Sequence, residues 1–229
     1  MKKIIFIYLI LFSYSFIAQN SITKNLGDFS ILKVYNGIEV ELIKSEFSKL
    51  EITGKKADKL KVKNVNNTLK LSLPFSLKPE NNLAEGELII KLYYNSELQT
   101  IDANEGATLT GKTIKQDKLT VNAQERAFIN LVVEVKELKV RASSGGIIKL
   151  TGTTINQNVD LDLYGIYHGY NLKPSLSSIV KAGTGAKAEV LAGNTLNAKV
   201  SFGGSIFYKG NPKVIKDKKV IGGTIQKRN

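Results

Sequence analysis

A short apolar unit recurs about every 20 residues through the second half of the chain. Each unit is an apolar residue, one variable residue and a second apolar residue, and the units begin at Ile101, Val121, Val140, Leu161, Val180 and Ala198. The steps between them are 20, 19, 21, 19 and 18 residues, and a glycine-rich or polar corner follows each unit. Strands and corners repeated at this period are typical of a β-solenoid, whose coils pair about 4.8 Å apart. We therefore expect these six residues to stack in one interior row.

Alternation with a period of two extends the β prediction to the rest of the chain. Ile38, Val40 and Leu42 alternate with glutamates, and residues 69–73 and 88–92 follow the same rule. Such alternation places one face of a strand in a core and the other in water. The predicted fold class is all-β: a single-stranded right-handed β-helix, or β-solenoid, with coils of about 20 residues. A β-sandwich with strands about ten residues apart is the alternative, and the recurrence of one unit favours the solenoid.

Residues 1–18 have the three parts of a secretory signal peptide. Two lysines precede an apolar run from Ile4 to Phe12, and Ala18 is a small residue at the expected cleavage point. The run is too short for a membrane-spanning helix, which needs about 20 apolar residues. We therefore expect an exported chain that begins near Gln19 and keeps no integral membrane segment. Its expected location is the periplasm, the outer-membrane surface or the cell exterior.

We expect residues 19–229 to form a single β-solenoid domain. The regular coils should occupy residues 98–229, where the repeat is found. Residues 19–97 show strand spacing without the repeat, and we expect irregular coils or a cap that covers unpaired backbone at one end. Within this region, residues 65–68 predict a hairpin turn and residues 74–86 an exposed loop.

Composition removes several classes of function. The chain has no Cys and one His, which excludes a disulfide framework, a Cys-ligated zinc site, a thiol nucleophile and a multi-His metal cluster. Its formal net charge is +13, and residues 164–229 hold eleven Lys or Arg against two acidic residues. For an exported chain this favours anionic glycans or lipid headgroups over nucleic acid, or else a solvated surface. Residues 216–219, three lysines and an aspartate, predict a charged turn.

Several segments in this order resemble a known family. They are residues 29–34 leading into 36–42, residues 50–54, the alanine-rich coils with glycine corners, and residues 208–212, which read Tyr-Lys-Gly-Asn-Pro. From about residue 27 to residue 225 the chain resembles the auto-transporter adhesin, head GIN domain family of secreted proteins from Gram-negative bacteria. The resemblance implies an exported, β-helical, adhesin-like protein without an established catalytic site. Likeness of this kind transfers shape better than activity.

Two features could carry catalysis. Asp160 and Asp162 lie on one face of a predicted strand, about 7 Å apart, a spacing found in inverting glycosidases. Arg141 and Lys181 are expected one coil away from Asp162, where they would neutralise the acid instead of raising its pKa. His168 has no Gly-x-Ser-x-Gly nucleophile motif to accompany it.

We therefore predict a non-enzymatic protein without catalytic residues, metal or cofactor. It would be adhesin-like, or a binding or structural protein of the cell envelope. The alternative is a carbohydrate-active enzyme, a glycosidase or lyase on a β-helix. An outward groove that holds two or more acids from adjacent coils would favour the enzyme.

The residues predicted to bind a ligand gather in the coil that departs most from the repeat. Tyr164, Tyr167 and Tyr170 fall within seven residues and surround His168. Aromatic rings with polar tips suit contact with glycans or proteins, and Lys181 adds positive charge. We expect the partners to be glycans or surface proteins of the envelope or host, with stacking on Tyr167. The alternative is that the rings cover a corner of the solenoid or pack under a loop.

Overall fold

The structure is a computed structural model that describes residues 21–78, 82–84 and 86–229. The signal peptide expected at 1–18 lies outside the described residues. One short 3-10 turn, η1 (Ala57–Lys59), accompanies the strands. The strands are β1 (Ile22–Asn25), β2 (Ile31–Val34), β3 (Glu39–Lys44), β4 (Lys49–Thr53), β5 (Lys61–Val65), β6 (Thr68–Ser72), β7 (Ile89–Tyr94), β8 (Thr100–Ala103), β9 (Thr108–Ala123), β10 (Phe128–Ala142), β11 (Ile147–Leu161), β12 (Ile166–Gly169), β13 (Leu172–Ala182), β14 (Lys187–Leu191), β15 (Thr195–Ser201), β16 (Ser205–Lys209), β17 (Val214–Val220) and β18 (Thr224–Lys227).

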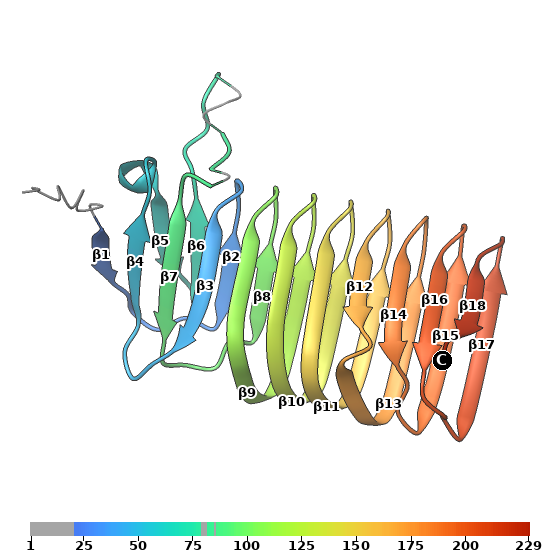
Figure 1. The fold of residues 1–229 in the computed structure, drawn as a ribbon. Coiled ribbons are helices and arrows are strands. Elements are labelled where there is room, and N and C mark those ends of the chain that lie inside the picture. Colours follow the sequence, from blue (N-terminus) through green and yellow to red (C-terminus); the bar gives the residue numbers. More distant parts are fainter. Residues whose placement is uncertain (1–20, 79–81, 85) are drawn as a thin grey trace, which may run out of the picture.

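Successive coils stack in one direction and form an elongated β-solenoid of about seven turns, each of about 19 residues (Figure 1). The predicted all-β solenoid is therefore confirmed. Strands β9, β10 and β11 are long because each runs along one face of the molecule, bends, and returns along the other. Face A is the face on which β9 begins, and it also contains β3, β7, β12, β14, β16 and β18. Face B is the face on which β9 ends, and it also contains β2, β6, β8, β13, β15 and β17.

Face B contains a continuous interior row of aliphatic side chains, all 0% exposed. The row consists of Leu69, Leu32, Ile101, Val121, Val140, Val159, Val180 and Ala198. Five of the six residues predicted for this row are therefore confirmed in it. The placement of Leu161 is wrong, because Leu161 stacks in the next row between Ala142 and Ala182.

This register error is two residues long, and side-chain alternation explains it. A slip of one residue would move a strand's apolar side chains to the other face, whereas a slip of two residues leaves them on the same face. Residues 159–161 and 161–163 both read apolar, acidic, apolar, so both fit the repeating unit. The structure separates them because Leu163 belongs to a turn, with a φ of 44° and a 49% exposed side chain.

Tight turns connect face B to face A along one edge of the solenoid, the upper edge in Figure 1. In most of these turns both central residues have positive φ, as in Glu105 with Gly106 and Leu163 with Tyr164. Glycine adopts this conformation without steric cost, whereas larger side chains are strained in it. We call this row of turns the turn edge. The opposite edge, formed by the bends of the long strands, is the bend edge.

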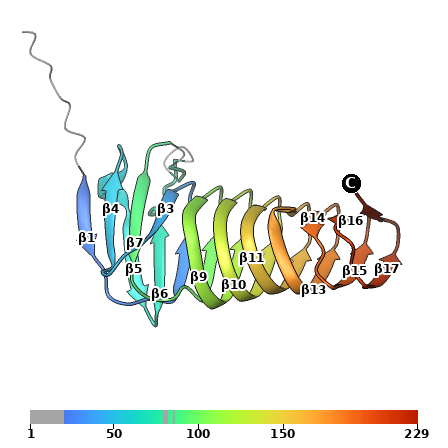
Figure 2. The ribbon, with the colours of Figure 1, turned by 60° about the horizontal axis from the view of Figure 1, so that its bottom comes forward.

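The N-terminal region contains both irregular coils and a cap. Strands β2 and β3 pair in parallel with β8 and β9, and β6 and β7 form a further coil outside them, out of sequence order. Strands β1 and β4 extend face A antiparallel, and β5 does the same on face B, which covers this end of the stack (Figure 2). The expected hairpin turn joins β5 to β6 through Asn66 and Asn67, whose φ angles are 50° and 58°.

The C-terminal end is built differently. Strands β17 and β18 pair in parallel with β15 and β16, and the described residues add no antiparallel strand beyond them. The charged turn predicted at 216–219 is wrong, because these residues lie inside β17. In the register, Asp217 follows Ala198 and Lys219 follows Val200, so both continue interior rows. Charged side chains at inward positions of an end strand oppose the addition of another coil.

Candidate binding surfaces

The five residues predicted to bind a ligand are not brought together. Tyr164 lies on the turn edge and is 67% exposed. His168 and Tyr170 lie on the outer surface of face A, and Lys181 lies on the outer surface of face B. The ring of Tyr167 lies in the interior and is 0% exposed. The expected stacking of a ligand on Tyr167 is therefore wrong.

Tyr167 fills its coil from the inside. In the register of face A it stands between Ile148 and Ala188. A Cβ atom at Gly169 would lie 2.5 Å from the Tyr167 ring, so glycine at this position makes room for the ring. The Tyr167 hydroxyl donates a hydrogen bond to Gln157 Oε1 at 3.4 Å, and burial raises the pKa of Tyr167. The residue is a packing element of the core.

Two members of the predicted site, His168 and Tyr170, belong to a larger group on the C-terminal half of face A. We call this group the aromatic–basic patch, and it consists of His168, Tyr170, Lys187, Glu189, Phe207, Lys209 and Arg228. Lys209 Nζ lies 5.1 Å from the centre of the Tyr170 ring. The Arg228 guanidinium carbon lies 4.5 Å from the centre of the Phe207 ring. Cation–π contacts of this kind hold basic groups over aromatic faces.

Glu189 is paired inside the patch. His168 Nδ1 lies 2.7 Å from Glu189 Oε2, and Lys187 forms an ion pair with the other carboxylate oxygen. Burial acts to raise the pKa of Glu189, but the hydrogen bonds from Lys187 and His168 outweigh it and lower the pKa. In the described part of the chain, Lys209 and Arg228 form no ion pair with a carboxylate. The patch therefore presents uncompensated positive charge beside aromatic rings.

A hollow of about 490 Å³ adjoins the patch on face A. Its lining includes His168, Tyr170, Glu189, Phe128, Ile147 and Lys149. Apolar walls with a few polar groups at the rim are typical of small-ligand sites, and they suit the two faces of a sugar ring. The hollow draws these groups from successive coils, which sequence spacing alone does not reveal.

The acid pair from the sequence is divided between two structural positions. Asp160, and not Asp162, lies in register with Arg141 and Lys181. These three residues line a hollow of about 200 Å³ on face B. Asp162 Oδ1 accepts hydrogen bonds from the backbone N–H groups of Leu163 and Thr184, at 2.9 and 2.8 Å, so Asp162 stabilises two turns. The predicted neutralisation of Asp162 by the two basic residues is therefore wrong, by the same slip of two residues as at Leu161.

One outward hollow does hold acids from adjacent coils, the arrangement that would favour an enzyme. Asp117 and Glu134 line a hollow of about 600 Å³ at the bend edge. Lys136 Nζ lies 2.8 Å from Asp117, and Lys115 Nζ lies 3.4 Å from Glu134. Each of the two acids is therefore paired with a lysine in this hollow. The described residues also contain no group of three or more His, Asp or Glu that could hold a metal ion.

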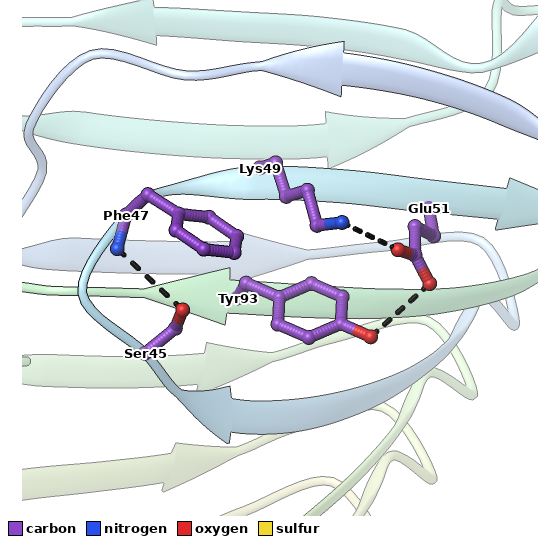
Figure 3. Close-up of polar contacts among 5 residues, drawn as sticks. All are labelled: Ser45, Phe47, Lys49, Glu51 and Tyr93. Carbon is purple, nitrogen blue, oxygen red and sulfur yellow. Dashed lines mark hydrogen bonds and ion pairs between the residues drawn. The ribbon is translucent and has the colours of Figure 1, made fainter.

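The sequence did not reveal a second aromatic cluster, which lies on the N-terminal part of face A (Figure 3). The ring centroids of Phe47 and Tyr93 are 6.2 Å apart, and Lys49 Nζ lies 4.7 Å from the centre of the Tyr93 ring. Glu51 accepts hydrogen bonds from Lys49 at 2.6 Å and from Tyr93 at 3.1 Å, and the contact with Lys49 lowers the pKa of Glu51. Its charges pair internally. The antiparallel pairing of β4 with β7 builds the cluster, and the sequence repeat does not encode this pairing.

Stacked parallel coils with ionic and aromatic groups on their outer faces define the class of protein: a β-solenoid scaffold. The chain belongs to the family described as "Putative auto-transporter adhesin, head GIN domain", whose model matches residues 28–212. The resemblance inferred from the sequence is therefore confirmed. A search of curated proteins finds no match. None of the described residues forms a helix long and apolar enough to cross a membrane.

Solved structures share this fold across nearly the whole chain. A "putative adhesin" from Bacteroides fragilis NCTC 9343 is 21% identical, with a TM-score of 0.80 over 92% of this chain and 97% of that one. A "putative lipid binding protein" from Parabacteroides distasonis ATCC 8503 is 18% identical, with a TM-score of 0.66 over 92% and 97%. A "putative adhesin" from Parabacteroides merdae ATCC 43184 is 18% identical, with a TM-score of 0.65 over 92% and 96%. These likenesses show a common fold.

Proposed function

We propose that the protein is an exported, non-enzymatic, adhesin-like protein that binds acidic polysaccharide through the aromatic–basic patch. The observation that carries the proposal is that Lys209 and Arg228 lie over aromatic rings without an acidic partner in the described chain. Carboxylates of an acidic sugar would pair with these cations. The apolar face of the sugar ring would stack on Tyr170 or Phe207.

The solenoid supplies the rigidity that such a site needs. Each patch residue stands on a strand that is hydrogen-bonded to its neighbours or at the end of one, so the spacing between coils fixes the spacing between groups. A polymer with a repeating charge could therefore contact several coils at once, and weak contacts would add up. An adhesin-like role requires binding of this kind and no reacting group.

The test is to measure the affinity of the mature chain for polygalacturonate and for neutral dextran across a salt series. We expect Arg228→Gln to weaken polygalacturonate binding mainly at low salt, because exposed charges are screened over about 8–10 Å at ordinary ionic strength. Phe207→Ala should weaken it at every salt concentration, because stacking is not a screened interaction. Lys139→Gln removes a basic residue from face B and should change little. Binding that ignores salt and both patch variants would contradict the proposal.

Two further measurements address the rest of the proposal. N-terminal sequencing of protein from its native host should give a chain that begins near Gln19, and an intact Met1 would contradict export. Incubation with acidic and neutral glycans should release no reducing ends or unsaturated products. If products appear and are lost in Asp117→Asn or Glu134→Gln, the carbohydrate-active alternative at the bend edge is correct.

A further inference from the structure

Among the residues that the structure describes, the turn edge and the loop between β6 and β7 carry most of the strongly exposed apolar side chains. Among the described residues, six large apolar side chains are at least 57% exposed: Val65, Phe75, Leu77, Tyr164, Phe202 and Ile221. All of these except Val65 lie on the turn edge or on the loop between β6 and β7 that rises from it (Figure 1). Exposed apolar groups that gather on one side of a soluble protein indicate a contact surface.

Four apolar residues in the turns at the C-terminal part of this edge make up what we call the apolar ridge: Leu163, Tyr164, Phe202 and Ile221. The turn of Thr184 and Gly185 lies between Tyr164 and Phe202, and the Tyr164 ring lies against Gly185. The φ angles of the four ridge residues are 44°, 62°, 49° and 53°. Glycine would occupy such positions without strain, and the β-branched side chain of Ile221 is poorly suited to them. Large apolar residues therefore bring backbone strain to these positions, and their side chains remain at least 49% exposed. Strain that is retained at exposed positions indicates a role outside folding.

Basic residues run alongside the ridge on face B. Lys181, Lys199 and Lys218 stack in register on successive coils, and all three are exposed. Asp160 precedes Lys181 in the same row, but none of the three lysines forms an ion pair in the described part of the chain. The apolar ridge and the lysines beside it therefore complement a layer that has an apolar interior and a negatively charged surface.

We propose that the apolar ridge inserts into the headgroup region of an anionic lipid membrane while the flanking lysines contact lipid phosphates. The shape of the ridge favours a membrane over a protein partner. A stable protein interface buries about 800 Å² on each side, whereas the ridge is a convex line of turn tips. Membrane association needs only a few apolar side chains that reach the interface and basic groups near the phosphates. Tyr164 also has the amphipathic side chain that is enriched at such interfaces.

Acidic residues set the limit of the contact. Glu105 and Glu125 occupy turn positions on the same edge, closer to the N-terminal end, and both are exposed. Anionic lipids would repel these two carboxylates, whereas the carboxylate of Asp162, beside Leu163, accepts hydrogen bonds from two backbone N–H groups. We therefore assign the membrane contact to the C-terminal coils. This surface is distinct from the aromatic–basic patch, which lies on the outer surface of face A.

The first experiment is sedimentation of the mature chain with vesicles of phosphatidylcholine alone or mixed with phosphatidylglycerol. The parent should bind the mixed vesicles, and Phe202→Ser with Ile221→Ser should lower the partition coefficient about 100-fold, or about tenfold for each side chain. Lys199→Gln should lower it about fivefold. The matched control is Leu176→Ser at the bend edge, a 49% exposed leucine whose replacement should have no effect. Phe207→Ala should also have no effect, which separates this surface from the patch.

The second experiment uses the absence of cysteine from the chain. An environment-sensitive fluorophore attached at Phe202→Cys should shift to shorter wavelength with mixed vesicles, and the same label at Leu176→Cys should not. Failure of the parent to bind mixed vesicles, or binding that survives the double serine change, overturns the proposal. A shift at Phe202→Cys that needs no vesicles and grows with protein concentration also overturns it, because a second copy of the chain would then occupy the ridge.

Discussion

Adjacent parts of the solenoid fill the same interior by different means. In the coils of β9, β10 and β11, the interior of face A is lined by Leu109, Ile129 and Ile148, which are similar in size and stack directly. In the coil of β12 and β13 the same position holds Tyr167, and small residues around it provide the space. The regular coils therefore depend on a repeated side-chain volume, whereas the irregular coil depends on specific neighbours.

The backbone shows the same difference. The offset between β11 and the next coil is 19 residues at Lys149 with His168, 20 at Gly152 with Leu172, and 21 at Asn156 with Ser177. Two extra residues are therefore accommodated as irregularities in one coil, as in β-bulges. Beneath them lies a polar contact absent from the aliphatic rows, in which Gln157 Nε2 donates to Ser178 Oγ at 3.0 Å. The coil that departs from the repeat thus contains both altered packing, around Tyr167, and an added interior hydrogen bond, between Gln157 and Ser178.

The largest effect is expected in the regular coils. Val140 is 0% exposed and stands between Val121 and Val159 in the interior row. Val140→Asp would bury a charge without a partner and should cost at least about 5 kcal/mol of unfolding free energy. Urea unfolding followed by far-UV circular dichroism measures the loss.

Lys139→Asp is the matched control for this prediction, since it places the same side chain one residue away on the outer surface. It should change the unfolding free energy by no more than about 0.5 kcal/mol. If Val140→Asp were as stable as the parent, the interior row would be misassigned.

The next largest loss of stability is expected in the irregular coil, at Tyr167, which occupies the position that an aliphatic residue holds in the regular coils. Tyr167→Ala should cost about 3–5 kcal/mol, because it leaves a cavity in a rigid interior. Tyr167→Phe keeps the ring and should cost about 1 kcal/mol, since Gln157 Oε1 loses a hydrogen bond. Thermal and urea unfolding of both variants give these values. Glycan binding by Tyr167→Phe equal to that of the parent would agree with a packing role, and a selective loss of binding in a fully stable variant would contradict it.

The sequence predicts the architecture of the regular coils well, for a physical reason. A solenoid repeats one local environment, so the 20-residue recurrence and the alternation of side chains both report the same stacking. The placement of Leu161 is wrong because a shift of two residues preserves the side-chain alternation and nearly preserves the 20-residue spacing. The order of the N-terminal coils was not predictable in this way. Strands β2 and β3 lie inside β6 and β7 in the stack, and that order depends on long-range pairing with no counterpart in the repeat.

The binding residues were harder to predict than the fold, because function here depends on which side of the backbone a residue occupies. Tyr164, Tyr167 and Tyr170 are evenly spaced in sequence, yet they lie on a turn, in the core and on an outer face. The small residues Gly169 and Ala188 are the sequence feature that indicates a large buried side chain beside them. Phe207 and Arg228 belong to later coils, so only the register brings them to the patch.

A smaller effect tests the compensation around Tyr167 directly. Gly169→Ala places a Cβ atom 2.5 Å from the Tyr167 ring and should cost about 1–3 kcal/mol. In the Tyr167→Ala background the same change should cost much less, because the ring that it would strike is gone. A double-mutant cycle by urea unfolding measures this coupling. Gly27→Ala is the control, since its Cβ would lie 3.7 Å from its nearest neighbour, and additive costs in the cycle would contradict the contact.

The smallest effects are expected at two carboxyl groups, one beside the first regular coil and one beside the irregular coil. Burial raises the pKa of Asp102, although Asn104 and Lys33 partly oppose it. For Glu189 the balance is reversed, because the hydrogen bonds from Lys187 and His168 outweigh burial and lower the pKa. The two carboxylates should therefore act on stability in opposite directions.

The sign follows from proton linkage. Folded Asp102 holds its proton more tightly than the unfolded chain, so a cost develops as pH rises above about 4, the ordinary pKa of an aspartate. Glu189 contributes stability above its unfolded pKa of about 4.3 and loses it as pH falls through its lower folded pKa. At pH 7, Asp102→Asn should therefore stabilise and Glu189→Gln should destabilise the protein, each by up to about 1 kcal/mol. Urea unfolding from pH 7 down to about pH 3 should show both differences shrink. Destabilisation by Asp102→Asn at neutral pH would mean that the ion pair with Lys33, at 3.8 Å, outweighs burial, and the two carboxylates would then behave alike.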